Sequence, residues 1–176
     1  MVDGAGSLAS IFYGLHASGT WGEPRGHNLL DGGAPFYDTY ETADGRWVSL
    51  GPLEPKFFAE FAQRVGLDER FVKRQYDRRE WPAMREAITT LMKSRTRDAW
   101  CQVLEGTDAC FAPVLDFAEA PQHRHAQARQ AFVTVDGVPQ PAPAPRFSHT
   151  PSPTPRPPGV GDEVGEVLAR WGVAQR

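Results

Sequence analysis

The chain has 176 residues, of which 40% are hydrophobic and 23% are charged, the balance of a folded globular protein rather than of a disordered one. Its 19 basic and 22 acidic residues are interspersed and give a net charge of −3, so no basic stripe marks a nucleic-acid-binding surface. No apolar run reaches the length of a membrane span, and no basic segment precedes an apolar stretch near Met1. These features predict a protein that is not embedded in a membrane, not exported and located in the cytoplasm.

Cysteine and histidine give no indication of a metal site. Cys101 and Cys110 have the spacing of neither a zinc ligand pair nor a redox motif, so we expect both to be packing groups. His123 and His125 flank Arg124, whose charge disfavours a bound cation, and no third ligand is clustered with them. The sequence therefore predicts no metal centre.

The first predicted element is a helix over residues 7–17, where Leu8, Ile11, Phe12 and Leu15 recur at helical spacing. This helix would begin almost at the first methionine, with apolar side chains around much of its surface. We therefore expect it to pack against structure that the chain does not supply. Residues 21–35 are rich in Gly, Pro, Asn and Asp and predict a loop.

A β-hairpin is the clearest local prediction. Residues 35–42 and 46–50 flank a short turn at Ala43-Asp44-Gly45, with glycine where a positive φ is needed. A helix should follow from Pro55 to Gly66, since proline suits the first helical turn and aromatic residues form one face. Two more helices are predicted over 80–93 and 96–104, the second with Thr96 as N-cap.

The remaining chain predicts shorter elements. Residues 109–115 indicate a strand, 117–129 have mixed helical character, and 131–135 followed by Asp136-Gly137 indicate another strand and a turn. Nine prolines between Pro139 and Pro158 predict an extended, polyproline-like segment without packed secondary structure. A last helix is predicted over 162–171. Together these elements predict an α+β fold, in which a small domain of antiparallel sheet and packed helices has an arm on either side.

Glu54 is the carboxylate with the most distinctive position. It follows a Gly51-Pro52 turn and precedes the proline that begins a helix, which places it at the mouth of the helix in an extended conformation. Two interpretations remain open on these residues alone. Glu54 is either a helix-capping residue or an active-site carboxylate.

The loop over residues 26–35 gathers His27, Asp31 and the pair Gly32-Gly33. Backbone amides of such a loop can approach a ligand closely. The loop has neither the dinucleotide-binding fingerprint nor a Walker spacing, so a purely structural turn is the alternative.

Longer stretches of the sequence resemble a known family. Residues 28–58 read NLLDGGAPFYDTYETADGRWVSLGPLEPKFF and are similar to a signature stretch of α-methylacyl-CoA racemases, of the class III CoA-transferase (CaiB/BaiF) family. The similarity continues through residues 106–115 and 143–148. Residue 52 departs from the family pattern, because proline stands where a smaller residue is expected.

The resemblance implies an arrangement of which this chain is the C-terminal half. Family members have a Rossmann-like large domain that binds CoA, and a small domain that completes the active site of an interlocked dimer. On this basis residues 1–27 would be a terminal helix and linker of the large domain, residues 28–125 the small domain, and residues 126–176 an arm that returns to the large domain. The partner would be a second copy of the chain or a complementing large-domain chain.

The resemblance also assigns roles to residues. Glu54 matches an active-site glutamate, and Asp31, Gly32, Gly33 and Tyr37 would border the same cleft and contact an acyl-CoA substrate. No other cofactor is implied. The family's acid/base His and Asp lie in the large domain, and neither His27 nor Asp31 takes their place. The implied activity is interconversion of (R)- and (S)-2-methylacyl-CoA, the alternatives being a CoA-transferase of the same family and a non-catalytic interaction module.

Overall fold

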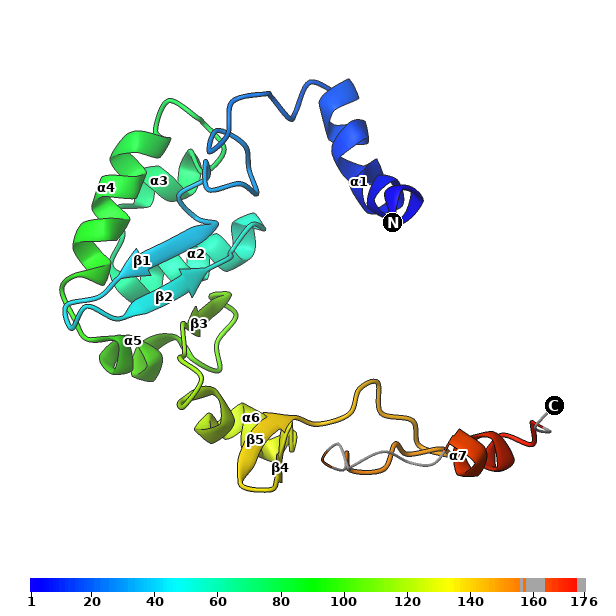
Figure 1. Ribbon diagram of the computed structural model, residues 1–176. Helices are drawn as coiled ribbons and strands as arrows, with labels where there is room; N and C mark the ends of the chain where they lie inside the picture. The colour runs from blue at the N-terminus through cyan, green and yellow to red at the C-terminus, as the bar shows by residue number, and fades with distance from the viewer. Residues whose placement is uncertain (156, 158–163, 174–176) are drawn as a thin grey trace. The chain divides into compact units, whose positions relative to one another are not determined.

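The structure is a computed structural model that describes residues 1–155, 157 and 164–173 (Figure 1). It divides into two compact units, Met1–Val114 and Leu115–Arg176. The α+β class is confirmed, and every described strand pairs antiparallel with its neighbour. The domain bounds of the previous section stay predictions. None of the described helices is both long and apolar enough to cross a membrane.

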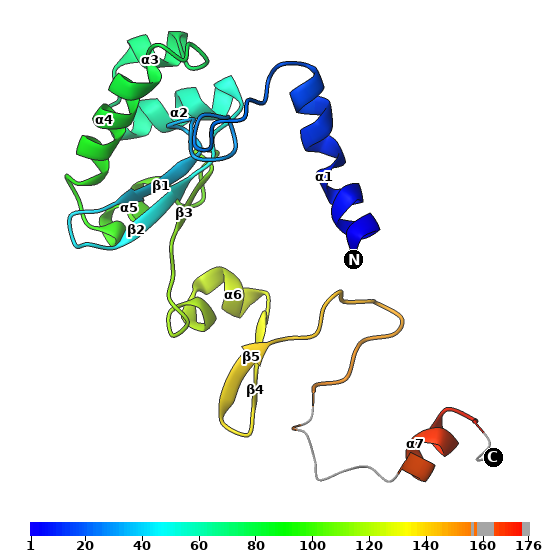
Figure 2. The ribbon, with the colours of Figure 1, turned by 45° about the horizontal axis from the view of Figure 1, so that its top comes forward.

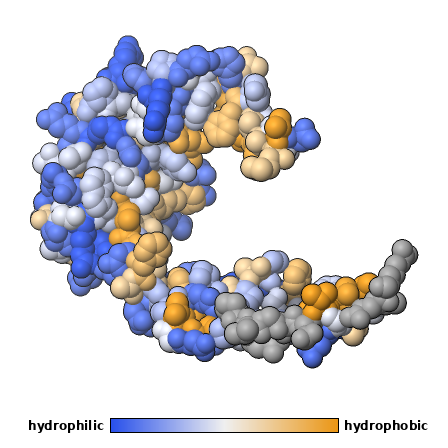
Figure 3. Space-filling model, in the orientation of Figure 1, coloured by the Kyte–Doolittle hydropathy of each residue, from blue (hydrophilic) through white to orange (hydrophobic). Residues whose placement is uncertain are grey.

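The first helix, α1 (Val2–Ala17), begins five residues earlier than predicted. Its first turn is closed by a hydrogen bond from the Ala5 N–H to the Met1 carbonyl, at 3.0 Å. None of its residues is buried. Leu8 and Ile11 expose 82% and 62% of their surface, and Figure 3 shows apolar side chains on the outside of this helix.

The sheet of the first unit contains the predicted hairpin. Strands β1 (Asp38–Glu41) and β2 (Trp47–Leu50) pair antiparallel with Tyr40 opposite Val48, and Gly45 in the turn has a φ of 73°. Strand β3 (Phe111–Pro113) joins the other side of β2. The order β1-β2-β3 therefore places the end of β2 between the loop before β1 and the loop before β3.

Four helices accompany the sheet (Figures 1 and 2). Helix α2 (Pro55–Val65) ends as predicted at Gly66, which adopts the left-handed conformation. Helices α4 (Trp81–Met92) and α5 (Arg97–Leu104) match the other two predictions. Thr96 is the N-cap of α5, since its side chain accepts a hydrogen bond from the Ala99 N–H. The short helix α3 (Glu69–Lys73) was not predicted, because five residues give too little periodicity.

The hydrophobic core lies within the first unit. Its buried apolar residues extend from Ala34 to Ala109 and come from the sheet, from α2 to α5 and from the loops between them. Phe36 organises one end, with its ring 5.5 Å from that of Phe58 and 5.9 Å from that of Trp81. The residue just before the predicted cleft residue Tyr37 is therefore fully buried in this core.

The second unit has smaller elements and no buried residue among those described. It contains the 3₁₀ turn η1 (Ala120–Gln122), helix α6 (Arg124–Ala128), strands β4 (Phe132–Val135) and β5 (Val138–Pro141), and helix α7 (Val164–Arg170). The predicted start of the last helix, residue 162, lies outside the described residues.

Strand β5 corrects the prediction for the proline-rich segment, because residues 138–141 form regular structure. The turn at Asp136 and Gly137 has positive φ at both residues, as a two-residue hairpin requires. Val138 pairs with Val135 and Gln140 with Val133, and the next even-numbered residue, Ala142, donates its N–H to the Ala131 carbonyl. The prolines at 139 and 141 thus occupy the alternate positions that face away from β4, where no donor is required.

Candidate active site

Glu54 is the N-cap residue of α2, with φ −70° and ψ 137°, the extended conformation predicted from the following proline. Its carbonyl accepts hydrogen bonds from the Phe57 and Phe58 N–H groups, both at 3.0 Å, and begins the helix. Its carboxylate makes no capping hydrogen bond, and the residue is exposed. Among the described residues the backbone of Glu54 therefore starts the helix, while its charged group stays available at the surface.

A hollow of about 520 Å³ lies where β1 and β2 meet the loops before β1 and β3. Three of the four residues predicted to border the cleft, Asp31, Gly32 and Tyr37, line it together. The remaining lining residues come from the strands and from the turn before β3; they are Leu30, Asp38, Thr39, Ser49, Leu50, Gly51, Cys110, Phe111 and Ala112. The lining combines apolar side chains, such as Leu30 and Phe111, with polar ones, such as Asp38 and Ser49.

Cys110 connects this hollow with Glu54. Its carbonyl accepts a hydrogen bond from the Gly51 N–H at 2.9 Å, and its backbone has an unusual φ of 49°. Burial raises the pKa of the Cys110 thiol, and the negative charges of Glu54, Asp108 and Glu60 raise it further. The negative charge of Glu54 thus acts on a thiol that lines the hollow, while Glu54 itself is not among the lining residues.

The raised pKa keeps this thiol protonated at neutral pH, in which state it is a poor nucleophile. Cys110 is exposed, so the prediction that both cysteines are packing groups is wrong for this residue. Cys101 is half-buried, and its pKa is raised to about 11 by burial, with the acidic groups of Glu105 and Asp98 adding to the effect. The described residues contain no cluster of three side chains that could hold a metal ion.

The Asp31 carboxylate is directed into its own loop. It accepts hydrogen bonds from the N–H groups of Gly26 and Asn28, at 3.1 and 2.7 Å, and from Nδ2 of Asn28 at 2.7 Å. Burial acts to raise the pKa of Asp31, but these hydrogen bonds, with one from Gly33, outweigh it and the pKa is lowered. The hydrogen bonds of this carboxylate therefore order the loop beside the hollow.

Two residues that hold this loop were not singled out in the sequence. Asn28 is 2% exposed and binds both the N–H and the carbonyl of Gly22 through its amide, at 2.7 and 3.0 Å. Arg85 of α4 donates to the carbonyls of Gly32 and Gly33, at 2.7 and 3.1 Å, and to the Asp38 carboxylate at 2.5 Å. A polar residue on a helix 47 or more positions away gives no local signal of such a contact.

Gly33 is set apart from the other predicted residues. It lines a separate depression of about 330 Å³, with Gly26, His27, Arg78, Trp81, Pro82 and Arg85. A Cβ at this position would lie 2.5 Å from the Asn28 carbonyl oxygen. Because glycine has no side chain, the backbone at Gly33 can approach that of His27 and Asn28 closely within the loop.

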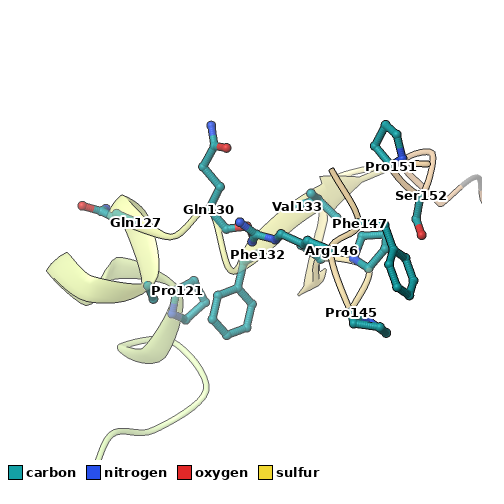
Figure 4. Close-up of a pocket in the computed structure, with 13 residues that line it drawn as sticks. Pro121, Gln127, Gln130, Phe132, Val133, Pro145, Arg146, Phe147, Pro151 and Ser152 are labelled. Carbon is teal, nitrogen blue, oxygen red and sulfur yellow. The ribbon is translucent and has the colours of Figure 1, made fainter. Parts of the chain in front are cut away.

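A larger hollow, of about 710 Å³, lies in the second unit and contains none of the predicted site residues (Figure 4). Proline, Phe132 and Phe147 form much of its wall. Arg146 crosses it and donates a hydrogen bond to the Gln130 carbonyl at 2.6 Å. Size alone does not identify the chemically relevant site, and the constellation around Glu54 has the stronger chemical character.

Known proteins match almost the whole chain. α-Methylacyl-CoA racemase from Mus musculus is 42% identical over 179 residues, which cover 99% of this chain and 47% of the mouse protein. The α-methylacyl-CoA racemase from Homo sapiens is 37% identical over 178 residues, with the same coverage. The chain thus spans about half the length of these curated relatives.

A solved structure and a family model agree with these matches. The orthorhombic crystal form of Rv3272 from M. tuberculosis superposes with a TM-score of 0.67 at 16% identity, over 94% of this chain and 45% of that one. At this identity the likeness concerns the fold alone. The sequence model of CoA-transferase family III matches residues 1–164. Because this match covers nearly all of the sequence, the chain belongs to CoA-transferase family III.

Proposed function

We propose that this chain forms the small-domain half of an acyl-CoA racemase that interconverts the (R)- and (S)-forms of 2-methylacyl-CoA thioesters. The observation that carries the proposal is the Glu54 carboxylate, which is exposed and makes no capping hydrogen bond. It follows three residues after Gly51, which lines the hollow together with Asp31, Gly32 and Tyr37. The racemase names of the mouse and human relatives support the choice of reaction.

The reaction inverts one carbon atom. A base removes the proton at C2, next to the thioester carbonyl, and the electron pair moves onto the carbonyl oxygen to form an enolate. An acid on the opposite face then returns a proton to C2, and the carbonyl is restored. The protein must supply one acid/base group on each side and hydrogen-bond donors for the enolate oxygen.

In our proposal the acid/base His and Asp come from the large-domain half, in a longer form of the protein or in a second chain. Glu54 orients or tunes the histidine of that pair. The apolar lining residues Leu30 and Phe111 receive part of the acyl chain, and the loop around Asp31 borders the hollow. A homodimer, or a complex with a complementing chain, completes the site in the cytoplasm, and acyl-CoA is required only as substrate.

Complementation tests this proposal. The chain is co-purified with a large domain from the same family, and loss of optical rotation of (R)-2-methylacyl-CoA is followed together with deuterium uptake at C2 in D₂O. We expect both signals with the wild-type chain, and a fall in kcat of at least about tenfold for Glu54→Gln, which keeps the side chain's size but removes its charge. Glu69→Gln, on the exposed surface of α3, is the matched control. No gain over the large domain alone would contradict the proposal.

Transfer of CoA between acids is the second candidate, since the matching family model carries that description. In a transferase an Asp nucleophile of the large domain would attack the thioester and form an acyl anhydride with release of CoA thiolate. Incubation with a labelled acceptor acid separates the two reactions. Label entering the CoA thioester pool favours transfer, whereas deuterium uptake without label favours racemisation.

A non-catalytic interaction module is the third candidate, and the exposed apolar side chains of α1 favour it. Exposed apolar surface of this kind promotes self-association or capture of a partner. Light scattering together with calorimetric titration of an acyl-CoA tests this alternative. Self-association without ligand binding and without complementation would support it against the racemase.

A further inference from the structure

Beyond the groups assigned above, the segment that carries Glu54 is held by two neighbouring side chains from the turn between α3 and α4. Nε2 of Gln75 donates hydrogen bonds to the carbonyls of Pro52 and Leu53, at 3.1 and 2.9 Å. The hydroxyl of Tyr76 donates to the same Leu53 carbonyl at 2.5 Å. These three bonds converge on the two residues that immediately precede Glu54.

The Gln75 side chain uses its amide nitrogen to hold the segment before Glu54, while its amide oxygen has no hydrogen-bond partner. It is 3% exposed, and both protons of its amide are directed at the Pro52 and Leu53 carbonyls. Its Oε1 atom is buried without a hydrogen-bond partner. Because an unsatisfied buried acceptor is unfavourable, a merely space-filling role would be served better by an apolar residue.

The pair Gln75 and Tyr76, called the clamp from here on, is itself fixed to the core. The Gln75 carbonyl accepts a hydrogen bond from Nε1 of Trp81 at 2.9 Å. The Tyr76 ring meets the buried Phe36 ring edge-on, with centroids 5.4 Å apart. Phe36 adjoins Tyr37 of the hollow, so one aromatic contact links the clamp to the lining of the candidate site.

Tyr76 is the less obvious partner, because it is 51% exposed and could bond to water instead. Its hydroxyl is nevertheless directed at the carbonyl beside Glu54. Burial raises the pKa of Tyr76, and the Glu54 charge raises it further, so the phenol remains a donor at neutral pH. The Glu54 charge therefore acts on the phenol, whose hydroxyl is bonded to the residue just before Glu54.

We propose that Gln75 and Tyr76 are positioning residues, which fix the backbone before α2 and thereby direct the Glu54 carboxylate toward the hollow. The hold on the backbone before Glu54 rests on the hydrogen bonds to the Pro52 and Leu53 carbonyls; the direction of the carboxylate is the proposal, and its meaning for catalysis rests on the proposed racemase function.

The Cys110 thiol provides a test that does not need activity. Rates of iodoacetamide alkylation at Cys110, resolved from Cys101 by mass spectrometry of peptides, are measured against pH at low ionic strength. Below the thiol pKa the rate follows the thiolate fraction. Removing the charge in Glu54→Gln lowers the thiol pKa, and we expect the rate at pH 7.5 to rise about threefold, as for a like charge nearby at a partly exposed site. Asp108 and Glu60 remain in every variant, so the difference isolates Glu54.

Tyr76→Phe keeps the ring against Phe36 and removes only the hydroxyl. We expect it to raise the alkylation rate about twofold, because the released carboxylate moves away from the thiol. Tyr40→Phe is the matched control, since the Tyr40 hydroxyl also donates to a backbone carbonyl, that of Pro35, at 2.6 Å. It should leave the rate unchanged. Gln75→Met, which fills the same space without donors, should behave like Tyr76→Phe.

The outcomes separate the two levels of the proposal. An alkylation profile of Tyr76→Phe equal to that of the wild type, while Glu54→Gln shifts it, would overturn the clamp, and so would an unshifted Glu54→Gln. In the complemented enzyme we expect Tyr76→Phe to lower kcat several-fold with little change in KM, and Tyr40→Phe to change neither. A shifted thiol profile in a complex that does not racemise would support the clamp and reject the racemase function instead.

Discussion

At the scale of single residues, the loop beside the hollow depends on close backbone approaches and on one carboxylate. Gly33 allows the chain to pass the Asn28 backbone, and Asp31 gathers the amides of the same loop. Neither role involves a ligand, yet both order the loop that borders the candidate site.

Gly33→Ala should destabilise the protein by about 1–3 kcal/mol, the usual range for a side chain forced into filled space. The new methyl group would lie 2.5–2.8 Å from backbone atoms of His27 and Asn28, which cannot rotate away. Urea unfolding followed by near-ultraviolet circular dichroism measures the change. Gly51→Ala is the control, because its Cβ would meet only ordinary contacts, at 3.7 Å or more, and its unfolding midpoint should stay near that of the wild type.

Asp31→Asn should reduce the acid sensitivity of the fold. The folded-state pKa of Asp31 is lowered, so this carboxylate stabilises the protein above its unfolded pKa of about 3.9 and loses that effect as the pH falls through the folded value. The wild type should therefore lose stability between pH 7 and pH 3. The variant should be less stable at pH 7 and should lose less between the two pH values, as judged by urea midpoints. Equal losses in both proteins would contradict the assignment.

At the scale of elements, capping signals and turn chemistry were read correctly from the sequence, because each depends on residues close together in the chain. Thr96 caps α5, Pro55 begins α2 and Gly66 ends it. Strand β5 was missed because composition suggested an extended proline segment, whereas pairing with β4 depends on which alternate positions the prolines occupy.

Thr96→Ala should cost about 1 kcal/mol of stability, since the hydrogen bond to the Ala99 N–H at 3.3 Å is lost. Thr96→Ser keeps the accepting oxygen and serves as the control. Thermal unfolding followed by far-ultraviolet circular dichroism measures both variants. A serine variant as unstable as the alanine variant would show that packing of the methyl group, and not the cap, is responsible.

At the scale of the whole molecule, the buried core and the candidate site lie in the same part of the chain. All buried residues among those described fall between residues 28 and 109, as do Glu54 and the four residues predicted to accompany it. The described residues of the second unit are all at least partly exposed. The chain also spans about half of its curated relatives.

A chain shortened to residues 1–114 should fold on its own. Because the core extends only from Ala34 to Ala109, we expect its urea midpoint to match that of the full chain, with a single cooperative transition. Near-ultraviolet circular dichroism of the buried aromatic residues follows the transition in both proteins. A clearly lower midpoint would show that the second unit contributes to the stability of the first.

The sequence by itself determined the elements whose signals are local: the hairpin, helices α2, α4 and α5, the position of Glu54 at a helix mouth, and the family. Only the tertiary structure decided what surrounds Glu54. Gln75 and Tyr76 contact the segment before Glu54 from more than 20 residues away in the sequence. Arg85 holds the loop from α4, and the pairing of β3 with β2 brings the preceding Cys110 to the hollow. Such contacts form when packing of the core brings separate segments together, and no periodicity along the chain records them.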